Sequence, residues 1–446
     1  MDENGWFSLR LRGSTGLEIL IHHAVRIGWS EHGGHGEKAH TIDVFPNVVI
    51  ANSQGISETQ SVRRISFRLK KLSDFFYYRH AEALRAHDLT PEQKALLEGL
   101  RYNRDWGPFL PEDIYVIHNY PEFFRFRIDD RTYSVWPGGT RTGATVSKLS
   151  AVVYPIPTIE FQEPVGIQEA LDRVWEWRRF FAQLAQSQLE FEAVWLQGPG
   201  DERGPVGNAY LPNLPNLQPR KGRERKGHEV SAHNLPLTQW EEREQLGEVM
   251  EKWLELGEQR RMFRSRLGGV IEDMADRVDA SDIIELCSGI EALDELAEKD
   301  TFPAGLVGHM AKAAAEKAGE AKIEIPLDRL CGVLGSLQRP SLALRLRELS
   351  RRVSPSVPDA DADILAKSAA KIRNTSAHGA SLEAQIQPLV SPTIAALAAL
   401  CSRFDLETAG MPCRGSNGAR AWPLVQFEEA MNYLRQLESK PDTKLR

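Results

Sequence analysis

Paired cysteines, a leader segment and long apolar runs are all missing from this sequence. Its four cysteines, Cys287, Cys331, Cys401 and Cys413, are far apart, and no two of them form a CxxC pair. Scattered cysteines of this kind indicate free thiols rather than a disulfide framework or a zinc site. The start, MDENGWFSLRLRG, lacks the basic and apolar regions of a signal peptide. No apolar run approaches the ~18 residues of a membrane-spanning helix. We therefore expect a cytoplasmic protein without membrane contact.

A surplus of positive charge is missing as well. The 55 lysines and arginines are outnumbered by 62 aspartates and glutamates, which gives a formal net charge of -7. Phosphate binding is driven by clustered Lys and Arg, so any contact with RNA or DNA has to come from a local basic patch. The length of 446 residues predicts two or three domains.

Residues 1–165 are predicted to form a β-rich domain. Segments such as GLEILIHHAVRIGW and EFFRFRIDDRTYSVW are rich in β-branched and aromatic residues, and turns containing Gly, Pro and Asn separate them. An antiparallel sandwich or a distorted barrel fits this spacing, with one helical interruption around PEQKALLEGLRYNRDW. The following aromatic residues are expected in its core rather than as platforms for base stacking: Trp6, Phe75, Phe76, Tyr77 and Tyr78.

Residues 166–236 are predicted to connect this domain to a helical one. They begin with an amphipathic helix from Ile167, followed by a strand, FEAVWLQG, and a loop rich in Gly and Pro. The helix has apolar residues at steps of three and four: Ala170, Leu171, Val174, Trp177, Phe180, Phe181 and Leu184. The loop has a basic run that is expected to be solvated, with RNA contact as the alternative: Arg220, Lys221, Arg223, Arg225 and Lys226.

Residues 237–446 are predicted to form an all-helical bundle of roughly six to eight helices, with Asp282 capping one of them. The predicted fold class is therefore α+β: a β-rich domain followed by an all-α bundle.

One short motif in the helical half carries chemistry. In KIRNTSAHGA, an arginine, Arg373, is followed directly by Asn374 and then, after three more residues, by His378. Metal-independent RNA cleavage needs proton transfer to and from the 2′- and 5′-oxygens, and histidine titrates near neutral pH. It also needs a fixed positive charge next to the negatively charged phosphorane, and the guanidinium fork of an arginine supplies that charge. The amide of Asn374 can orient the imidazole or the phosphate.

The spacing of the motif suggests a helix break. Residues five apart on an unbroken helix are rotated by about 140° from one another. Thr375 and Ser376 favour a helix start, and Gly379 weakens continuation. We therefore expect Arg373 near a helix end and His378 near the break.

RNTSAH resembles the R-(polar)-x-x-x-H signature of the HEPN superfamily, whose active members are helical ribonucleases. The preceding IIELCSGIEALDEL is similar to the helix before the motif in ApeA-like anti-phage HEPN proteins, with Glu291 in a supporting role. IQEALDRVWEWRRFFAQL, FEAVWL and EVMEKWLELGEQ resemble the order of elements in that group. The likeness is loose over most of the chain and firmer over residues 240–410. A second branch of the superfamily has a tyrosine two residues after the histidine, where this chain has Ala380.

The resemblance implies a homodimer in which two motifs face each other, which suits a helical half with few histidines. It also implies an endoribonuclease of anti-phage abortive infection or a toxin, acting on RNA such as tRNA. The products would carry 2′,3′-cyclic phosphate and 5′-OH ends, no metal or cofactor would be needed, and the β-rich half would sense a phage-derived trigger. The alternatives are a non-catalytic HEPN adaptor for dimerisation or ligand binding, and a DNA-binding regulator, which no helix-turn-helix pattern supports.

Two further clusters are candidate sites. An arginine-rich helix before the motif is expected to form a positive rim for RNA, with salt bridges between helices as an equal alternative: Arg345, Arg347, Arg351 and Arg352. In SEHGGHGEKAH, the residues His32, His35 and His40 lie in a Gly-rich context, which favours a surface loop over a metal site.

Overall fold

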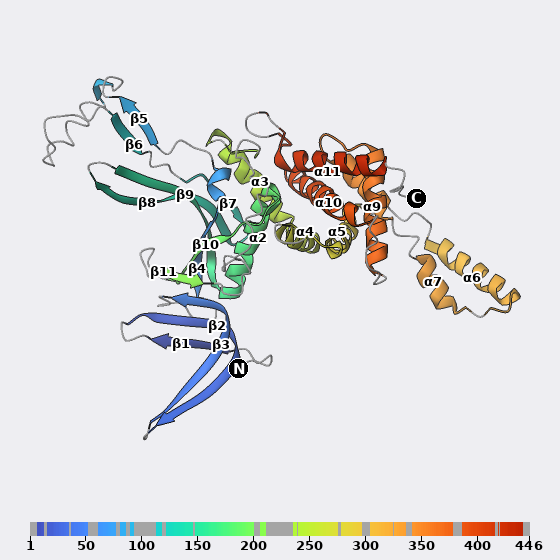
Figure 1. Cartoon of the computed structure of the whole chain (residues 1–446), viewed down its shortest axis with the longest axis horizontal. Helices are drawn as coiled ribbons and strands as arrows, with labels where there is room; N and C mark the ends of the chain where they lie inside the picture. The colour runs from blue at the N-terminus through green and yellow to red at the C-terminus, as the bar shows by residue number, and fades with distance from the viewer. Residues whose placement is uncertain are drawn as a thin grey trace.

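The β-rich first half and the helical second half are both present in the structure, and the α+β fold class is confirmed. Figure 1 shows the strands on one side and most of the helices on the other. The structure is a computed structural model that describes residues 7–12, 16–34, 37–51, 61–76, 81–85, 90–92, 113–117, 122–145, 148–199, 206–210, 235–238, 240–274, 278–296, 304–323, 325–335, 341–377, 386–414, 418 and 420–439. The expected helix in PEQKALLEGLRYNRDW lies almost entirely outside these residues.

The main sheet is antiparallel and open along its described strands. Its nine strands run in the order β1-β2-β3-β11-β10-β4-β9-β8-β7, so β1 and β7 are its edges. Their bounds are Phe7–Arg12 (β1), Glu18–Gly34 (β2), Glu37–Ala51 (β3), Val62–Leu69 (β4), Phe124–Ile128 (β7), Arg131–Thr145 (β8), Lys148–Val165 (β9), Phe191–Gln197 (β10) and Val206–Tyr210 (β11). A separate pair joins β5 (Ala81–Arg85) to β6 (Asp113–Ile117). In place of the expected sandwich or barrel, nine of the described strands form one open sheet, and helix α2 (Ile167–Ala185) lies against one of its faces.

Two central strands come from the segment that was expected only to connect the two halves. β10 pairs with β4 on one side and with β11 on the other, and β11 pairs with β3. The strand expected in FEAVWLQG is therefore present, but it lies in the middle of the sheet. The main sheet therefore includes two strands that follow residue 165, β10 and β11.

Helix α2 (Ile167–Ala185) covers the apolar face of this sheet. All seven apolar positions predicted for it are buried. Its Phe181 ring lies 5.1 Å from that of Phe75, which precedes it by more than a hundred residues and belongs to the short 3-10 helix η1 (Leu72–Phe75). Burial of each large apolar side chain stabilises the fold by roughly 1.5–3 kcal/mol. Phe75 and Phe76 are core residues, as predicted, whereas Trp6, Tyr77 and Tyr78 lie outside the described residues.

The Gly-rich histidine segment forms strands rather than the expected surface loop. β2 and β3 pair as far as Gly34 and Glu37, with His32 opposite Ala39 and Glu31 opposite His40. His35 lies outside the described residues.

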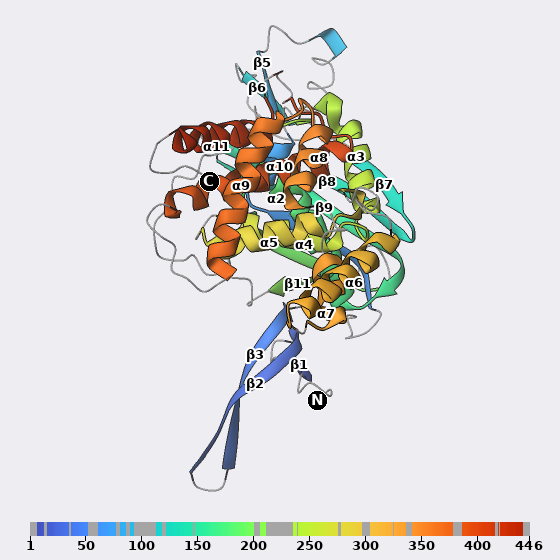
Figure 2. The ribbon, with the colours of Figure 1, turned by 90° about the vertical axis from the view of Figure 1, so that its right-hand side faces the viewer.

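Nine α-helices lie between Arg243 and Glu438 in the described part of the chain. They are α3 (Arg243–Glu255), α4 (Arg261–Asp273), α5 (Ala280–Glu291), α6 (Ala304–Glu320), α7 (Leu327–Gly335), α8 (Leu342–Arg352), α9 (Asp359–Ala377), α10 (Gln387–Thr408) and α11 (Trp422–Glu438), with 3-10 turns η3 (Trp240–Glu242) and η4 (Asp294–Leu296). Helix α10 is central and packs against α4, α5, α9 and α11. Figure 2 shows this helical layer in front of the sheet.

A buried ion-pair network joins α3, α4 and α10. The fully buried carboxylate of Asp405 accepts hydrogen bonds from Arg260 at 2.9 Å, from Arg264 at 2.8 and 3.0 Å, and from the indole of Trp253 at 2.7 Å. Buried charges need such complete pairing, because an unpaired charge in a low-dielectric interior is strongly unfavourable. The network fixes the core of the bundle to the helix next to the sheet.

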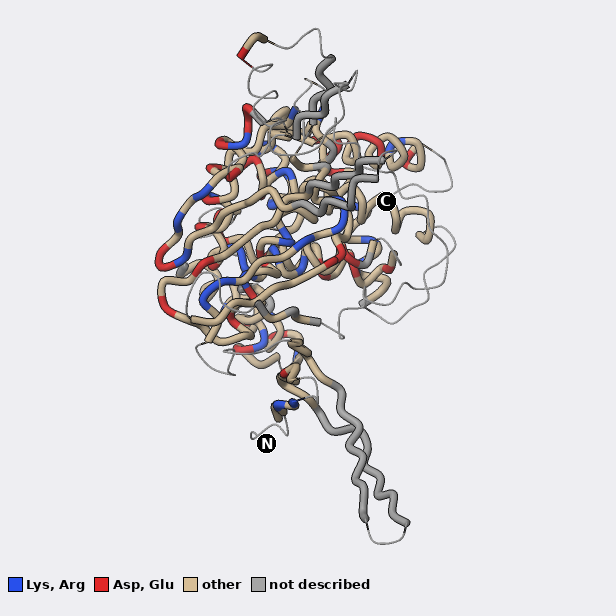
Figure 3. Tube along the Cα trace, turned by 90° about the vertical axis from the view of Figure 1, so that its left-hand side faces the viewer, with Lys and Arg blue, Asp and Glu red and all other residues tan. Residues whose placement is uncertain are grey.

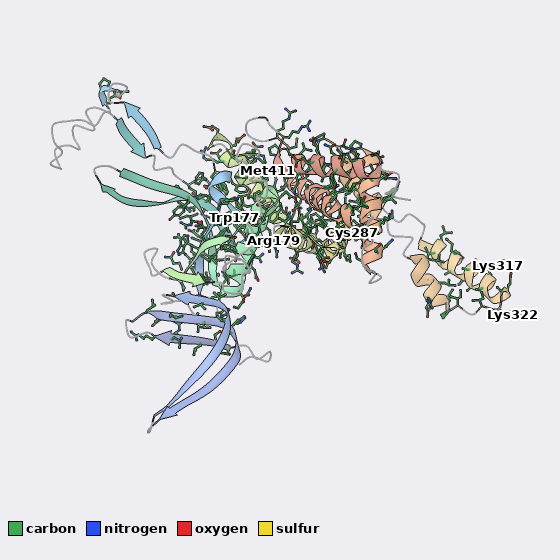
Figure 4. The ribbon with its side chains drawn as sticks, in the orientation of Figure 1. Trp177, Arg179, Cys287, Lys317, Lys322 and Met411 are labelled. Atoms are coloured by element: carbon green, nitrogen blue, oxygen red, sulfur yellow. The ribbon has the colours of Figure 1, made fainter. Side chains whose placement is uncertain are left out.

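Helices α6 and α7 form a hairpin that projects from the bundle, and α6 packs mainly against α7. Lys317 and Lys322, labelled in Figure 4, lie near its outer end. Several of its apolar side chains are exposed: Leu306, Met310, Ile323, Ile325 and Leu327.

Helix α10 is the one described helix that is long and apolar enough to cross a membrane. However, 83% of its most apolar window is buried inside the protein. That burial is typical of the core helix of a soluble protein.

Candidate active site

The motif arginine lies in the last part of α9, next to the end of α5. Ile372 and Ala369 are fully buried and pack α9 against the bundle core. This packing fixes the helix so that Arg373 points toward α5. Its side chain is 38% exposed. A guanidinium in that position is held by the fold and still reaches solvent.

Arg373 is bound by the glutamate that the resemblance singled out. Its Nη1 donates to Oε1 of Glu291 at 2.6 Å, and the Glu291 side chain is 41% exposed. The two residues are 82 positions apart in the sequence, and Glu291 is the last residue of α5. The hydrogen bond to this carboxylate raises the pKa of Arg373 above its ordinary value, although burial opposes the shift. Such a pair leaves the rest of the guanidinium fork available to an anion.

A buried thiol lies one turn before Glu291 on the same helix. Burial raises the pKa of Cys287 to about 12, and the nearby charge of Arg373 opposes this shift. The thiol is therefore neutral at physiological pH and unsuited to act as a nucleophile. Figure 4 labels Cys287 within the bundle. All four cysteines are free, as predicted.

The end of α9 departs from the expected break. The helix continues through Thr375 and Ser376 and ends at Ala377. Thr375 lies inside the helix, where its hydroxyl donates to the carbonyl of Lys371 at 2.9 Å, one turn earlier. Arg373 lies four residues before Ala377, the last described residue of α9. His378 and Ala380 lie outside the described residues.

The two polar neighbours of Arg373 differ in their surroundings. Asn374 is exposed, so its amide is free to meet a ligand. The Ser376 hydroxyl is buried and has no hydrogen-bond partner among the described residues. Ser376 was expected only to favour a helix start, because a serine hydroxyl within a helix is usually bound to the backbone of its own helix.

The arginines of α8 are held mainly by partners within the protein. Arg345 is 6% exposed and donates to the carbonyl of Leu293 at 2.9 Å, so it does not belong to a surface rim. Arg347 forms two hydrogen bonds with Asp363, at 2.7 and 2.9 Å, and these raise its pKa. The remaining two pair with acidic residues: Arg351 with Asp359 and Arg352 with Glu348. Three of the four arginines therefore form salt bridges, which was the alternative role. RNA binding by the exposed arginines of α8 stays a prediction.

Neither the basic run nor the possibility of a metal site adds a candidate site among the described residues. The basic run at residues 220–226 lies outside the described residues. Among the residues that the structure does describe, no group of three or more His, Cys, Asp or Glu side chains could hold a metal ion.

Comparisons with protein-family models, with curated proteins and with solved structures gave no match. The resemblance to HEPN proteins therefore stays a prediction, and the support for the site comes from its own residues. The site consists of Arg373, whose guanidinium is partly exposed, Glu291, which binds and orients that guanidinium, and the exposed amide of Asn374. Together they can bind and orient a phosphate.

Proposed function

We propose that this chain is a metal-independent endoribonuclease of the HEPN type. In the proposed reaction, a 2′-hydroxyl attacks the neighbouring phosphorus while a base removes its proton. The 5′-oxygen leaves and takes up a proton from an acid, so the products carry a 2′,3′-cyclic phosphate and a 5′-OH. His378 supplies the proton transfers, with its symmetry mate in a homodimer as the second group.

The observation that carries this proposal is the hydrogen bond from Arg373 to Glu291. It joins two residues that were selected from different helices by the same family resemblance, and it orients the guanidinium at the exposed end of α9. Arg373 would stabilise the developing charge on the phosphorane, and Glu291 would position Arg373. Asn374 would orient the phosphate or the imidazole.

The biological setting follows from the same resemblance. We propose a cytoplasmic effector of anti-phage abortive infection or a toxin, with RNA such as tRNA as its substrate. The β-rich half would sense the trigger or restrain the bundle.

A non-catalytic HEPN adaptor is the second candidate, and one observation favours it. The charge of Arg373 is balanced by the carboxylate of Glu291, as in a purely structural ion pair. The two functions differ in whether RNA is cleaved.

The test is RNA cleavage in EDTA by the purified full chain, with tRNA and mixed cellular RNA as substrates and with analysis of the product ends. We expect cyclic phosphate ends from the wild type, and a loss of about 10²–10⁴-fold in His378→Ala and Arg373→Ala. Arg266→Ala is the matched control, because Arg266 pairs with Glu285 on the same helix α5 and is similarly exposed. Equal cleavage by Arg373→Ala and Arg266→Ala would refute the site, and no cleavage by any variant or by the wild type would favour the adaptor.

A further inference from the structure

A row of polar residues crosses five strands on the face of the sheet that is turned away from α2. The ladder places Gln197 opposite Arg64, Arg64 opposite Glu160, Glu160 opposite Thr132, and Thr132 opposite Arg127. The neighbouring residues in these strands, such as Ile65, Phe161 and Leu196, are buried in the core. Because side chains alternate between the faces of a strand, the polar row lies on the open face.

This row forms the floor of a cavity of about 440 Å³. Three further elements border the cavity: the turn between β7 and β8 with Asp130, the end of β4 with Arg63, and the end of β10 with Gly198. Arg127 donates to Oε1 of Gln162 at 2.7 Å and to the carbonyl of Asp129 at 3.1 Å. The cavity falls within the range of roughly 300–1,000 Å³ that is usual for small-molecule sites.

The charges around the cavity are incompletely balanced. Arg64 pairs with Glu160 at 2.5 Å, and Asp130 pairs with Arg131 at 3.3 Å. Arg127 is bonded only to neutral oxygens, and the exposed Arg63 has no carboxylate partner among the described residues. The guanidinium groups of Arg63 and Arg127, which both line the cavity, are thus available to an anion. Glu160, Gln162 and Gln197 can accept hydrogen bonds from hydroxyl or amino groups.

We propose that this cavity binds a phosphorylated small molecule of about the size of a mononucleotide. The guanidinium forks of Arg63 and Arg127 hold the phosphate. The acceptors on the floor meet its hydroxyl or amino groups.

The surrounding surface argues against a nucleic-acid strand as the ligand. Binding of a strand needs a continuous basic track with stacking platforms. On this face, Arg125 pairs with Glu122 at 2.8 Å and Arg68 pairs with Glu192 at 2.5 Å. Figure 3, which faces the sheet, shows basic and acidic segments interspersed along the strands. These two described arginines outside the cavity are therefore balanced by carboxylates, in contrast to Arg63 and Arg127.

The cavity is separate from the candidate active site. It opens on the sheet face that is visible in Figure 3, whereas Arg373 belongs to the helical layer that is in front in Figure 2. The proposal therefore does not depend on the ribonuclease activity.

The experiment is calorimetric titration of the purified full chain with ATP, AMP, inorganic phosphate and a single-stranded RNA oligonucleotide. We expect binding of at least one nucleotide, weakened at least tenfold by Arg127→Ala. Arg125→Ala is the matched control, because Arg125 is on the same strand and face but outside the cavity, and we expect its affinity to stay within twofold of the wild type.

A second variant, Arg63→Glu, reverses a charge at an exposed position where folding should not suffer, which circular dichroism checks. It should abolish nucleotide binding. The proposal is overturned if no nucleotide binds at millimolar concentration, or if Arg127→Ala and Arg125→Ala bind equally well. It is equally overturned if the RNA oligonucleotide binds more tightly than the mononucleotides and Arg127→Ala abolishes that RNA binding.

Discussion

At the scale of single residues, His22 on β2 has an unusual environment. Its side chain is 4% exposed, its ring stacks on that of His23 at 4.1 Å, and its Nε2 has no hydrogen-bond partner among the described residues. Burial, and secondarily the charge of His23, lower the pKa of His22 to about 4. An imidazole in such a place is stable only in its neutral form.

This environment predicts a loss of stability in mild acid. In the unfolded chain, His22 titrates near its ordinary pKa of 6.5, whereas in the folded protein it titrates near 4. Between these two pH values the unfolded state binds a proton that the folded state does not. The contribution of His22 to the free energy of unfolding is therefore fully present above pH 6.5 and falls as the pH falls toward 4. At pH 5 the loss should be about 1–2 kcal/mol relative to pH 7.

The measurement is urea unfolding of the wild type and of His22→Gln at pH 7 and pH 5. Other titrating groups are common to both proteins, so the difference between their pH dependences isolates His22. The same pH dependence in both would contradict this account.

Residue roles could be predicted where they follow from chemistry that is local in the sequence. An acidic cap was expected for α5, and the helix does begin at one. However, the cap is Asp279, and Asp282 completes a capping box by accepting from the Asp279 backbone at 2.8 Å. The family resemblance implied only a supporting role for Glu291, and its bond to Arg373, 82 positions away, was not predicted. The burial of Arg345 could not be seen, because its acceptor is a carbonyl 52 residues away.

At the scale of elements, the α6–α7 hairpin contributes little to the rest of the protein. Its helices pack on each other, and Val307 and Ala311 are buried within the hairpin. It contains no tryptophan, so tryptophan fluorescence reports only on the remainder of the chain.

We therefore predict that replacing residues 304–335 by a flexible Gly-Ser linker changes the free energy of unfolding by less than about 1 kcal/mol. Urea unfolding followed by tryptophan fluorescence measures this change. Leu346→Ala in α8 is the comparison, because that side chain is fully buried in the bundle, and its loss should cost about 2–5 kcal/mol. A deletion as costly as this substitution would mean that the hairpin belongs to the core.

Element type was predictable wherever the apolar period was clear, as in α2. Strand pairing was not, because the partners of β10 are chosen by long-range packing and its sequence carries no sign of them. The histidine-rich segment was misread as a loop because its glycines weaken a strand pattern, although they do not prevent pairing in a hairpin.

At the scale of the whole molecule, Asp405 connects two cores. Trp253 belongs to the apolar core shared with the sheet, whereas Phe404, next to Asp405, belongs to the core of the bundle. The carboxylate accepts hydrogen bonds from both layers. The two cores should therefore unfold together.

We predict that Asp405→Asn destabilises the entire chain by about 3–5 kcal/mol, because the buried Arg264 would lose its carboxylate partner and Arg260 would keep only Glu295. Far-ultraviolet circular dichroism and tryptophan fluorescence should shift to the same lower urea midpoint. Glu285→Gln is the control, since its pair with Arg266 is exposed and such pairs contribute little. Separate transitions for the two signals in the variant would show that the layers are independent.

The interleaved strand order has a consequence for synthesis of the chain. In the sheet, β11 and β10 lie between β3 and β4 and join them. This part of the sheet cannot form until residue 210 has left the ribosome. Until then, the nascent chain presents two bare strand edges, which are the usual starting points for aggregation. A premature stop anywhere between residues 165 and 190 would remove both strands and leave β3 and β4 without these neighbours.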